Sequence, residues 1–402
     1  MLRDRSRDQR VTHAELFFDL VFVFAVTQLS HRLIGERSVE AVLQSALLLA
    51  MVWLAWVYTT WVTNWLDPAR IPVRVVLLVT SLISLVMSAG LPRAFADRAW
   101  VVAGAYVAMQ VGRSAFVVIS LARSATDPDV ASLRRNYQRI LTWSVASGAA
   151  ALAGAGVHGH AREGLWLLAV LIDLTGGAVG FFSPGLGRST TRDWTIEGGH
   201  FAERCQAFIL IALGESVVVT GATFADVEQV TLPVAAAFVA AFLGAIAFWW
   251  LYFDRSADAA ADVIAAADDP GAMGRSAYHS IHPVMIAGII VTAAADELVL
   301  AHPSRHAELA TVWMTLGGAA LFLIGHGLFI WVVWRVVPWT RIVAGVVLVA
   351  LAPLGTSLPA LAVGAIALAV LLTVIFIDRR TAPSVADEEC AVAPDTWTSS
   401  GR

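Results

Sequence analysis

Long apolar stretches alternate with short polar ones along most of the 402-residue chain. A helix of about 20 apolar residues crosses the roughly 30 Å hydrocarbon layer of a bilayer. By this measure twelve stretches are predicted to be membrane-spanning helices, in two sets of six. The first set is expected at 13–34, 39–65, 71–91, 97–122, 138–157 and 164–184, and the second at 200–222, 231–254, 278–301, 308–336, 340–356 and 358–378. The pattern predicts an all-α polytopic membrane protein with about twelve transmembrane helices.

The polar stretches divide the chain into five parts. Residues 1–12 are expected to be a cytoplasmic N-terminal segment, and the first span is expected to stay in the mature protein because no small-residue cleavage site follows it. Residues 13–184 form the first six-helix half and residues 200–378 the second. Residues 185–199, rich in Gly, Ser and Thr, are the predicted linker, and residues 379–402 are predicted to be a disordered cytoplasmic tail.

The placement of arginine predicts the orientation. All 27 basic residues are arginines. If the N-terminus lies inside, nineteen arginines fall in cytoplasmic segments and six in outer loops. Because cytoplasmic loops are enriched in Lys and Arg, this distribution favours an even number of spans with both termini in the cytoplasm.

The composition excludes two classes of function. Hydrophobic residues make up 58% of the chain and charged residues 14%, whereas soluble domains carry about 25% charged residues. A cytosolic enzyme is therefore excluded, and the lipid bilayer is the expected partner. The formal net charge of −4 offers no basic surface, so no nucleic-acid partner is expected. Cys205 and Cys390 lie in an apolar stretch and in the polar tail, so no disulfide framework is expected.

Short motifs shared by the two sets indicate an internal duplication, although such matches between apolar segments also arise by chance. They are His13-Ala-Glu15 with His200-Phe-Ala-Glu203, Trp56-Val-Tyr58 with Trp250-Leu-Tyr252, and Gly112-Arg113-Ser114 with Gly325-His326-Gly327. Because six is an even number, the halves are predicted to be parallel repeats related by an axis along the membrane normal, an arrangement that transporters use.

Ionisable residues within the predicted spans are the candidate functional residues, because a charge at the membrane centre costs at least about 2.5 to 3.5 kcal/mol on insertion scales. In the first span, Glu15 and Asp19 are four residues apart and share one helical face. The two carboxylates could share a proton or a cation. Alternatively, both lie near the cytoplasmic end and pair with arginines there.

The seventh span carries four ionisable residues, His200, Glu203, Arg204 and Glu215. Glu203 and Arg204 could simply anchor the cytoplasmic end of this helix. Glu215 lies twelve residues beyond Glu203, or about 18 Å along the helix axis, so it is expected past the middle of the membrane. There it must be protonated, paired or in contact with water, and it is the strongest candidate for a proton or cation site.

Arg113 and His326 are the expected internal counter-groups, with Arg204 as a third. Either of the first two could neutralise Glu215 across the interior, and a relay between Glu215 and His326 is conceivable because histidine titrates near neutral pH. The alternative is a buried pair that only fixes helix packing. Asp173 in the sixth span is a weaker candidate.

No metal and no cofactor are predicted. His279 and His282, like His302 and His306, have spacings that place two ligands on one helical face. These pairs lie at opposite ends of the ninth span, and no set of three or four ligands accompanies them. No nucleotide-binding glycine loop or nucleophile motif is present.

Two long strings carry a family resemblance. Glu-Leu-Phe-Phe-Asp-Leu-Val-Phe-Val-Phe at 15–24 and His-Phe-Ala-Glu-Arg-Cys-Gln-Ala-Phe-Ile-Leu-Ile-Ala-Leu-Gly-Glu-Ser at 200–216 closely resemble signatures of the bacterial low temperature requirement protein A family. The resemblance extends from about residue 10 to 378. It implies a multi-pass protein of the bacterial cytoplasmic membrane in a family linked to growth in the cold, without a substrate. It also strengthens Glu15, Asp19, His200, Glu203 and Glu215 as candidate residues.

Three functions remain open from the sequence. The leading hypothesis is a transporter or channel for a small solute or cation, coupled to protons, with Glu215 as the site and Glu15 and Asp19 lining an inner vestibule. The second is a membrane-embedded enzyme for a lipid or isoprenoid, in which Glu15 and Asp19 face His200 and Glu203 as acid and base. The third is a non-catalytic membrane scaffold linked to cold growth.

Overall fold

The computed structural model describes residues 2–3, 11–122, 127–190, 198–254 and 256–381, and in these residues it contains helices and no strand. The helices of the first half are α1 (His13–Gly35), α2 (Val39–Trp65), α3 (Ile71–Gly90), η1 (Leu91–Arg93), α4 (Ala99–Ala122), α5 (Pro128–Ala155) and α6 (His160–Ala178). Those of the second half are α7 (Gly198–Ala225), α8 (Leu232–Phe253), α9 (Ala257–Ala265), α10 (Pro270–Gly274), η3 (Arg275–Ile281), α11 (His282–Ala301), α12 (Leu309–Trp334), α13 (Trp339–Gly355) and α14 (Ala360–Thr381). Most of the N-terminal segment, the centre of the predicted linker and the tail beyond residue 381 lie outside the described residues.

The prediction of an all-α polytopic membrane protein is confirmed. Within the described ranges, nine helices are long and apolar enough to cross a membrane. The other three predicted spans correspond to α5, α6 and α13. The first two carry more polar and charged residues, and α13 has only 17 residues. The count of twelve spans therefore stays a prediction.

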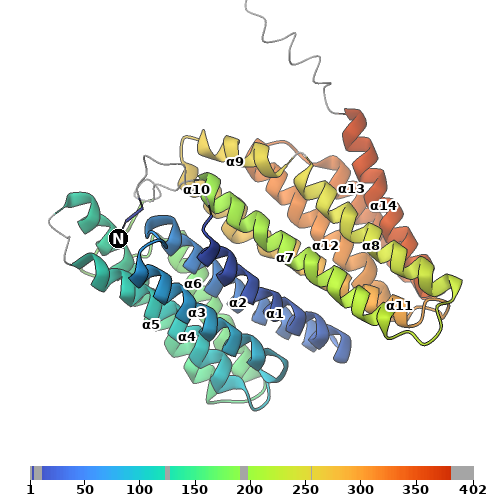
Figure 1. Cartoon of the computed structure of the whole chain (residues 1–402), viewed down its shortest axis with the longest axis horizontal. Helices are drawn as coiled ribbons and strands as arrows, with labels where there is room; N and C mark the ends of the chain where they lie inside the picture. Colours follow the sequence, from blue (N-terminus) through green and yellow to red (C-terminus); the bar gives the residue numbers. More distant parts are fainter. Residues whose placement is uncertain (1, 4–10, 123–126, 191–197, 255, 382–402) are drawn as a thin grey trace, which may run out of the picture.

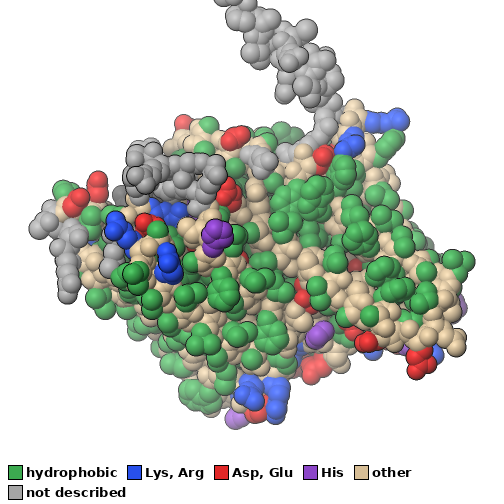
Figure 2. Space-filling view, in the orientation of Figure 1, with side chains coloured by type: hydrophobic (Ala, Val, Ile, Leu, Met, Phe, Trp, Pro, Cys, Tyr) green, Lys and Arg blue, Asp and Glu red, His purple; other side chains and the backbone are tan. Residues whose placement is uncertain are grey.

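The two halves lie side by side (Figure 1), with α1 and α7 in contact at the boundary between them. Similar helix contacts occur in each half, since α1 packs on α3 as α7 packs on α11, and α2 packs on α6 as α8 packs on α14. This correspondence is what parallel repeats would produce, and the duplication itself remains a prediction. Hydrophobic side chains cover much of the surface in Figure 2, and most of the charged side chains gather toward its two ends. This distribution is typical of a lipid-facing surface.

The start of α1 places the first candidate residue at the end of the bundle. Thr12 is the N-cap, and its hydroxyl accepts a hydrogen bond from the backbone N–H of Glu15. The Glu15 carboxylate in turn accepts hydrogen bonds from the backbone N–H and the hydroxyl of Thr12, at 2.9 and 2.8 Å. This reciprocal capping satisfies donors that the first helical turn leaves free. It also fixes the Glu15 side chain at one end of the boundary between α1 and α7.

Candidate functional site

A buried ion pair joins the two halves at one end of the boundary. The Arg204 guanidinium of α7 donates to both carboxylate oxygens of Asp19 on α1, from Nε to Oδ2 at 2.6 Å and from Nη2 to Oδ1 at 2.5 Å. The indole N–H of Trp56 donates to Oδ1 of Asp19 at 2.7 Å. Arg204 and Asp19 are almost completely buried. Two parallel bonds between a guanidinium and a carboxylate form one of the stronger pairings available to a protein, so Asp19 is held firmly between the halves.

Glu15 extends this ion pair into a network of four charged groups. Its Oε1 atom lies 2.7 Å from Nη2 of Arg3, 3.0 Å from Nε2 of His200 and 3.2 Å from Nη1 of Arg204. Besides His200, the network contains two carboxylates and two guanidinium groups, whose charges balance. The structure therefore brings together Glu15, Asp19, His200 and Arg204, as the sequence indicates, and adds Arg3, which lies outside every predicted span. We refer to Arg3, Glu15, Asp19, His200 and Arg204 as the inner charge network.

Glu203 does not join the inner charge network, because it is exposed while the adjacent Arg204 is buried. Successive residues on an α-helix point about 100° apart, so only one of the two can face α1. The expectation that Glu203 faces Glu15 and Asp19 is corrected here. The inward position carries a positive charge, which compensates the two acids of α1.

Glu215 lies further along the same boundary, in a different environment. One carboxylate oxygen, Oε2, accepts a hydrogen bond from the Thr27 hydroxyl of α1 at 2.5 Å. The other oxygen, Oε1, is buried and has no hydrogen-bond partner among the described residues. The side chain is only 1% exposed, and His31 and Glu297 are near enough to interact with it electrostatically. Glu215 is thus a buried acid with half of its hydrogen-bonding capacity unused.

An aromatic layer separates Glu215 from the inner charge network. Phe208, four residues after Arg204 and seven before Glu215 on α7, packs against Phe22 of α1 at 6.1 Å between ring centroids. It also contacts Trp53 and Trp56 of α2, at 5.4 and 4.7 Å. All four rings are buried. We call Phe22, Trp53, Trp56 and Phe208 the aromatic layer. On the facing sides of α1 and α7, no polar side chain lies between the two acidic positions, which are the inner charge network and Glu215.

Arg113 forms its hydrogen bonds inside the first half. Its guanidinium donates to the Ala55 carbonyl at 3.2 Å, the Thr59 hydroxyl at 3.0 Å and the Gln110 side-chain oxygen. The Gln110 amide donates to Asp173 at 2.9 Å, so it connects the buried arginine to a buried acid. Arg113 therefore has a compensating carboxylate close by in its own half.

His326 lies on α12 in the second half, where its Nε2 atom is 3.2 Å from the Ser256 hydroxyl. Among the described residues, neither His326 nor Arg113 contacts Glu215. The expected pairing of Glu215 with one of these counter-groups is therefore wrong. Residues at a similar depth in the membrane need not be neighbours, and α7, which carries Glu215, packs against α1, α2, α8, α9 and α11 rather than α4 or α12.

No group of three or more His, Cys, Asp and Glu side chains able to hold a metal ion occurs in the part of the chain that the structure describes. Of the predicted histidine pairs, His282 lies 2.7 Å from the Tyr252 hydroxyl through Nε2 and 3.0 Å from the Ala277 carbonyl through Nδ1. Both of its ring nitrogens are thus already hydrogen bonded within the helices.

The residues that sequence reasoning missed are Arg3, Thr27, Phe208 and the pair of tryptophans on α2. Tryptophan is common near the ends of membrane spans, but Trp53 and Trp56 lie well inside α2 (Val39–Trp65). Both are 2% exposed or less and pack inside the boundary. A signal was present in the position of Trp56, nine residues before the end of α2 at Trp65, because an indole N–H buried at that depth needs a hydrogen-bond acceptor.

Comparisons with known proteins identify a family and one relative. The family model of the bacterial low temperature requirement A protein (LtrA) matches residues 10–376. An uncharacterized protein of Rhizobium meliloti (strain 1021) is 34% identical over 343 residues, which cover 85% of this chain and 82% of that protein. No solved structure matches the chain. All residues of the boundary except Arg3 lie within the matched range, and the chain belongs to the bacterial low temperature requirement A family.

Proposed function

We propose that this membrane protein is a transporter or channel that moves a proton or a small cation along the boundary between α1 and α7. The observation that carries the proposal is the carboxylate of Glu215, which is buried between the two halves and whose Oε1 atom has no hydrogen-bond partner among the described residues. A buried carboxylate that lacks partners favours binding a proton or a cation. Ionisable residues inside a membrane commonly mark ion and proton pathways.

The other parts of the boundary fit distinct roles in such a pathway. The inner charge network holds the two halves together where the arginine count predicts the cytoplasm. The aromatic layer, about 10 Å from Glu215 along α7, blocks passage between the two acidic positions. In this proposal the resting state is closed at the aromatic layer, and ions reach Glu215 when the two halves move relative to each other.

The enzyme hypothesis receives less support from these contacts. It requires Glu15 and Asp19 to be available as acid and base, but Arg204, Trp56, Thr12 and Arg3 occupy their oxygens. Glu203, the second acid in that hypothesis, is exposed. The scaffold hypothesis assigns no role to the unused oxygen of Glu215. The test described next distinguishes this hypothesis from transport.

The test is ion flux in liposomes that contain the purified full-length protein. Proton flux is followed as internal pH with a trapped dye under an imposed potassium diffusion potential, and uptake of labelled sodium is measured in separate vesicles for the alternative cation. Wild type is expected to conduct, and Glu215→Gln, which keeps the size of the side chain but removes its charge, is expected to lose at least tenfold in rate. Thr27→Val removes the one donor to Glu215 and is expected to slow flux by a smaller factor.

The matched control is Glu228→Gln, an exposed acid in the loop after α7, which should conduct as wild type does. Each variant is first checked for monodisperse elution and for an unchanged thermal transition. Equal flux in wild type and Glu215→Gln, or no proton or cation flux in wild type, would overturn the proposal. The latter result would favour the scaffold hypothesis.

A further inference from the structure

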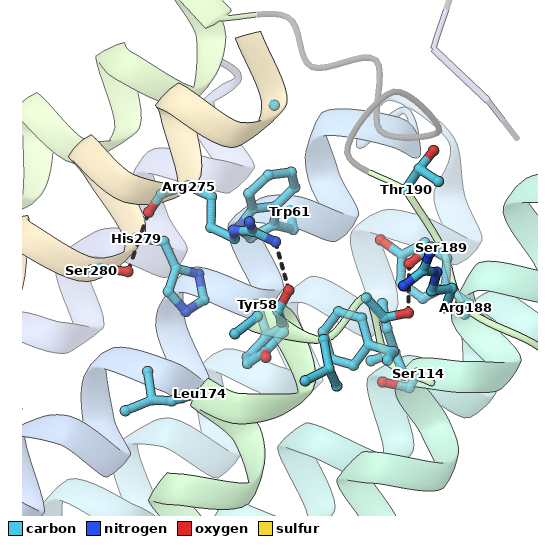
Figure 3. A pocket seen from close by; sticks show the side chains of 18 of the residues that line it. Tyr58, Trp61, Ser114, Leu174, Arg188, Ser189, Thr190, Arg275, His279 and Ser280 are labelled. Carbon is cyan, nitrogen blue, oxygen red and sulfur yellow. Dashed lines mark hydrogen bonds between the residues drawn. The ribbon is translucent and has the colours of Figure 1, made fainter. Parts of the chain in front are cut away.

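A cavity of about 540 Å³ lies at the end of the bundle where α2 and α6 finish, separate from the α1–α7 boundary. Its walls come from α2, α4, α5, the end of α6 with the loop after it, α10 and η3 (Figure 3). A cavity of this size is within the range of sites for small molecules. Neither Glu215 nor any residue of the inner charge network lines it.

The charged lining of the cavity is entirely positive. Arg113, Arg188 and Arg275 line it, and no Asp or Glu of the described residues does. Arg113 has a compensating acid behind it, as described above. Arg188 and Arg275 form no ion pair with any described residue, and Nη1 of Arg275 donates only to the Gly177 carbonyl, at 2.5 Å. Two guanidinium charges therefore face this space without a carboxylate partner among the described residues.

A histidine adds an unused polar group to the same wall. His279 is 7% exposed and lines the cavity. Its ring packs edge-on against Tyr58 at 5.4 Å between centroids, and its ring nitrogens form no hydrogen bond with described residues. Figure 3 shows Arg275, Trp61 and His279 on one side of the cavity and Arg188, Ser189 and Thr190 on the other.

The backbone of η3 explains how one short segment supplies so many of these groups. Residues Arg275–Ile281 form a π-helical turn between α10 and α11. Arg275, Ser276, His279 and Ser280 of this turn all line the cavity. π-helical turns are rare and often occur at functional sites.

We propose that this cavity binds a phosphate ester through Arg188, Arg275 and His279. One guanidinium group can donate two parallel hydrogen bonds to two oxygens of a phosphate. An imidazole N–H can donate to a third oxygen. The volume exceeds what inorganic phosphate needs, and Trp61 and Leu174 supply apolar wall for an organic group. Leu174 and Val179 are also exposed, at 41% and 43%, so acyl chains could leave the cavity past them toward the bilayer.

The phosphate could belong to a lipid headgroup or to a soluble ester, and two probes with the same headgroup distinguish them. The full-length protein is placed in phosphatidylcholine nanodiscs, and binding of radiolabelled glycerol 3-phosphate is measured at equilibrium. In parallel, nanodiscs containing phosphatidic acid are used, and lipid retained by the protein is counted by native mass spectrometry. Retention of phosphatidic acid alone identifies a lipid headgroup, whereas binding of glycerol 3-phosphate identifies a soluble ester, and either result supports the proposal.

The variants are Arg188→Gln and Arg275→Gln. Each is expected to lower the affinity for the probe that wild type binds about tenfold, because a charge-assisted hydrogen bond is lost. The matched control is Arg135→Gln, an exposed arginine of α5 outside the cavity, with an expected change below twofold. Arg188 is exposed and has no side-chain hydrogen bond with the described residues, so its variant keeps the test valid if Arg275→Gln fails to fold. The proposal is overturned if wild type binds neither probe, or if Arg135→Gln weakens binding as much as Arg188→Gln does.

Discussion

Asp19 and Glu215 are both buried acids on the boundary between the halves, and their surroundings differ. Asp19 accepts two hydrogen bonds from Arg204 and one from Trp56. Glu215 accepts one from Thr27, and its other oxygen has no partner in the part of the chain that the structure describes. A carboxylate with every oxygen bonded to cations and donors stabilises the contact between helices, whereas one with an unused oxygen is free to bind a ligand. Burial alone therefore does not identify the functional acid.

The largest expected effect is on stability, and it comes from replacing Asp19, the acid whose two oxygens are both hydrogen bonded. Asp19→Asn puts an amide N–H₂ next to donors of Arg204 and Trp56 and leaves a buried guanidinium undercompensated. Loss of one partner of a buried ion pair costs about 3 to 5 kcal/mol, so the free energy of unfolding in detergent micelles, followed by circular dichroism, should fall by that amount.

The double variant Asp19→Asn with Arg204→Gln provides the control for that measurement. Removing both charges should recover part of the lost stability, because no unpaired buried charge remains at this position. A single variant as stable as wild type would show that the ion pair does not hold the halves together.

The same change of carboxylate to amide should have a much smaller effect on stability at Glu215. In Glu215→Gln the side-chain carbonyl can still accept from Thr27, and no cation loses a partner. We expect the free energy of unfolding to change by no more than about 1 kcal/mol, measured as for Asp19→Asn. A loss as large as that of Asp19→Asn would mean that Glu215 is also a structural acid, and the contrast between the two would disappear.

The smallest expected effect is at Glu203, next to Arg204 on α7. Its side chain is exposed and belongs to neither acidic position. Glu203→Gln should alter unfolding free energy by no more than about 0.5 kcal/mol, as is usual for surface substitutions, and should leave liposome flux at the wild-type rate. A clear loss of flux in this variant would place a second acid on the pathway.

The membrane helices were largely predictable because apolar length is a direct physical requirement. The first two predicted spans, 13–34 and 39–65, coincide with α1 (His13–Gly35) and α2 (Val39–Trp65) to within one residue. Hydrophobicity is less informative for α5, whose first half carries Arg134, Arg135 and Arg139. The helix forms there all the same, but its length and composition do not identify it as a span.

The direction in which each side chain points from its helix was much less predictable. Most positions of α7 are apolar on all sides, so no polar stripe indicates which of Glu203 and Arg204 points inward. Partners distant in sequence were also hidden, as with Thr27 and Glu215, which lie 188 residues apart. These contacts depend on which helices pack together, and apolar periodicity does not specify neighbours when nearly every face is hydrophobic.

The charge balance of the inner network has a consequence for the response to membrane voltage. The two guanidinium charges of Arg3 and Arg204 cancel the two carboxylate charges of Glu15 and Asp19. An electric field exerts no net force on such a group while its members stay together. An ionised Glu215 has no ion-pair partner among the described residues. Moving one charge across the whole membrane changes the electrical free energy by about 2.3 kcal/mol at a potential of 100 mV. Sensitivity to voltage at this boundary should therefore arise from the single carboxylate of Glu215 rather than from the larger network.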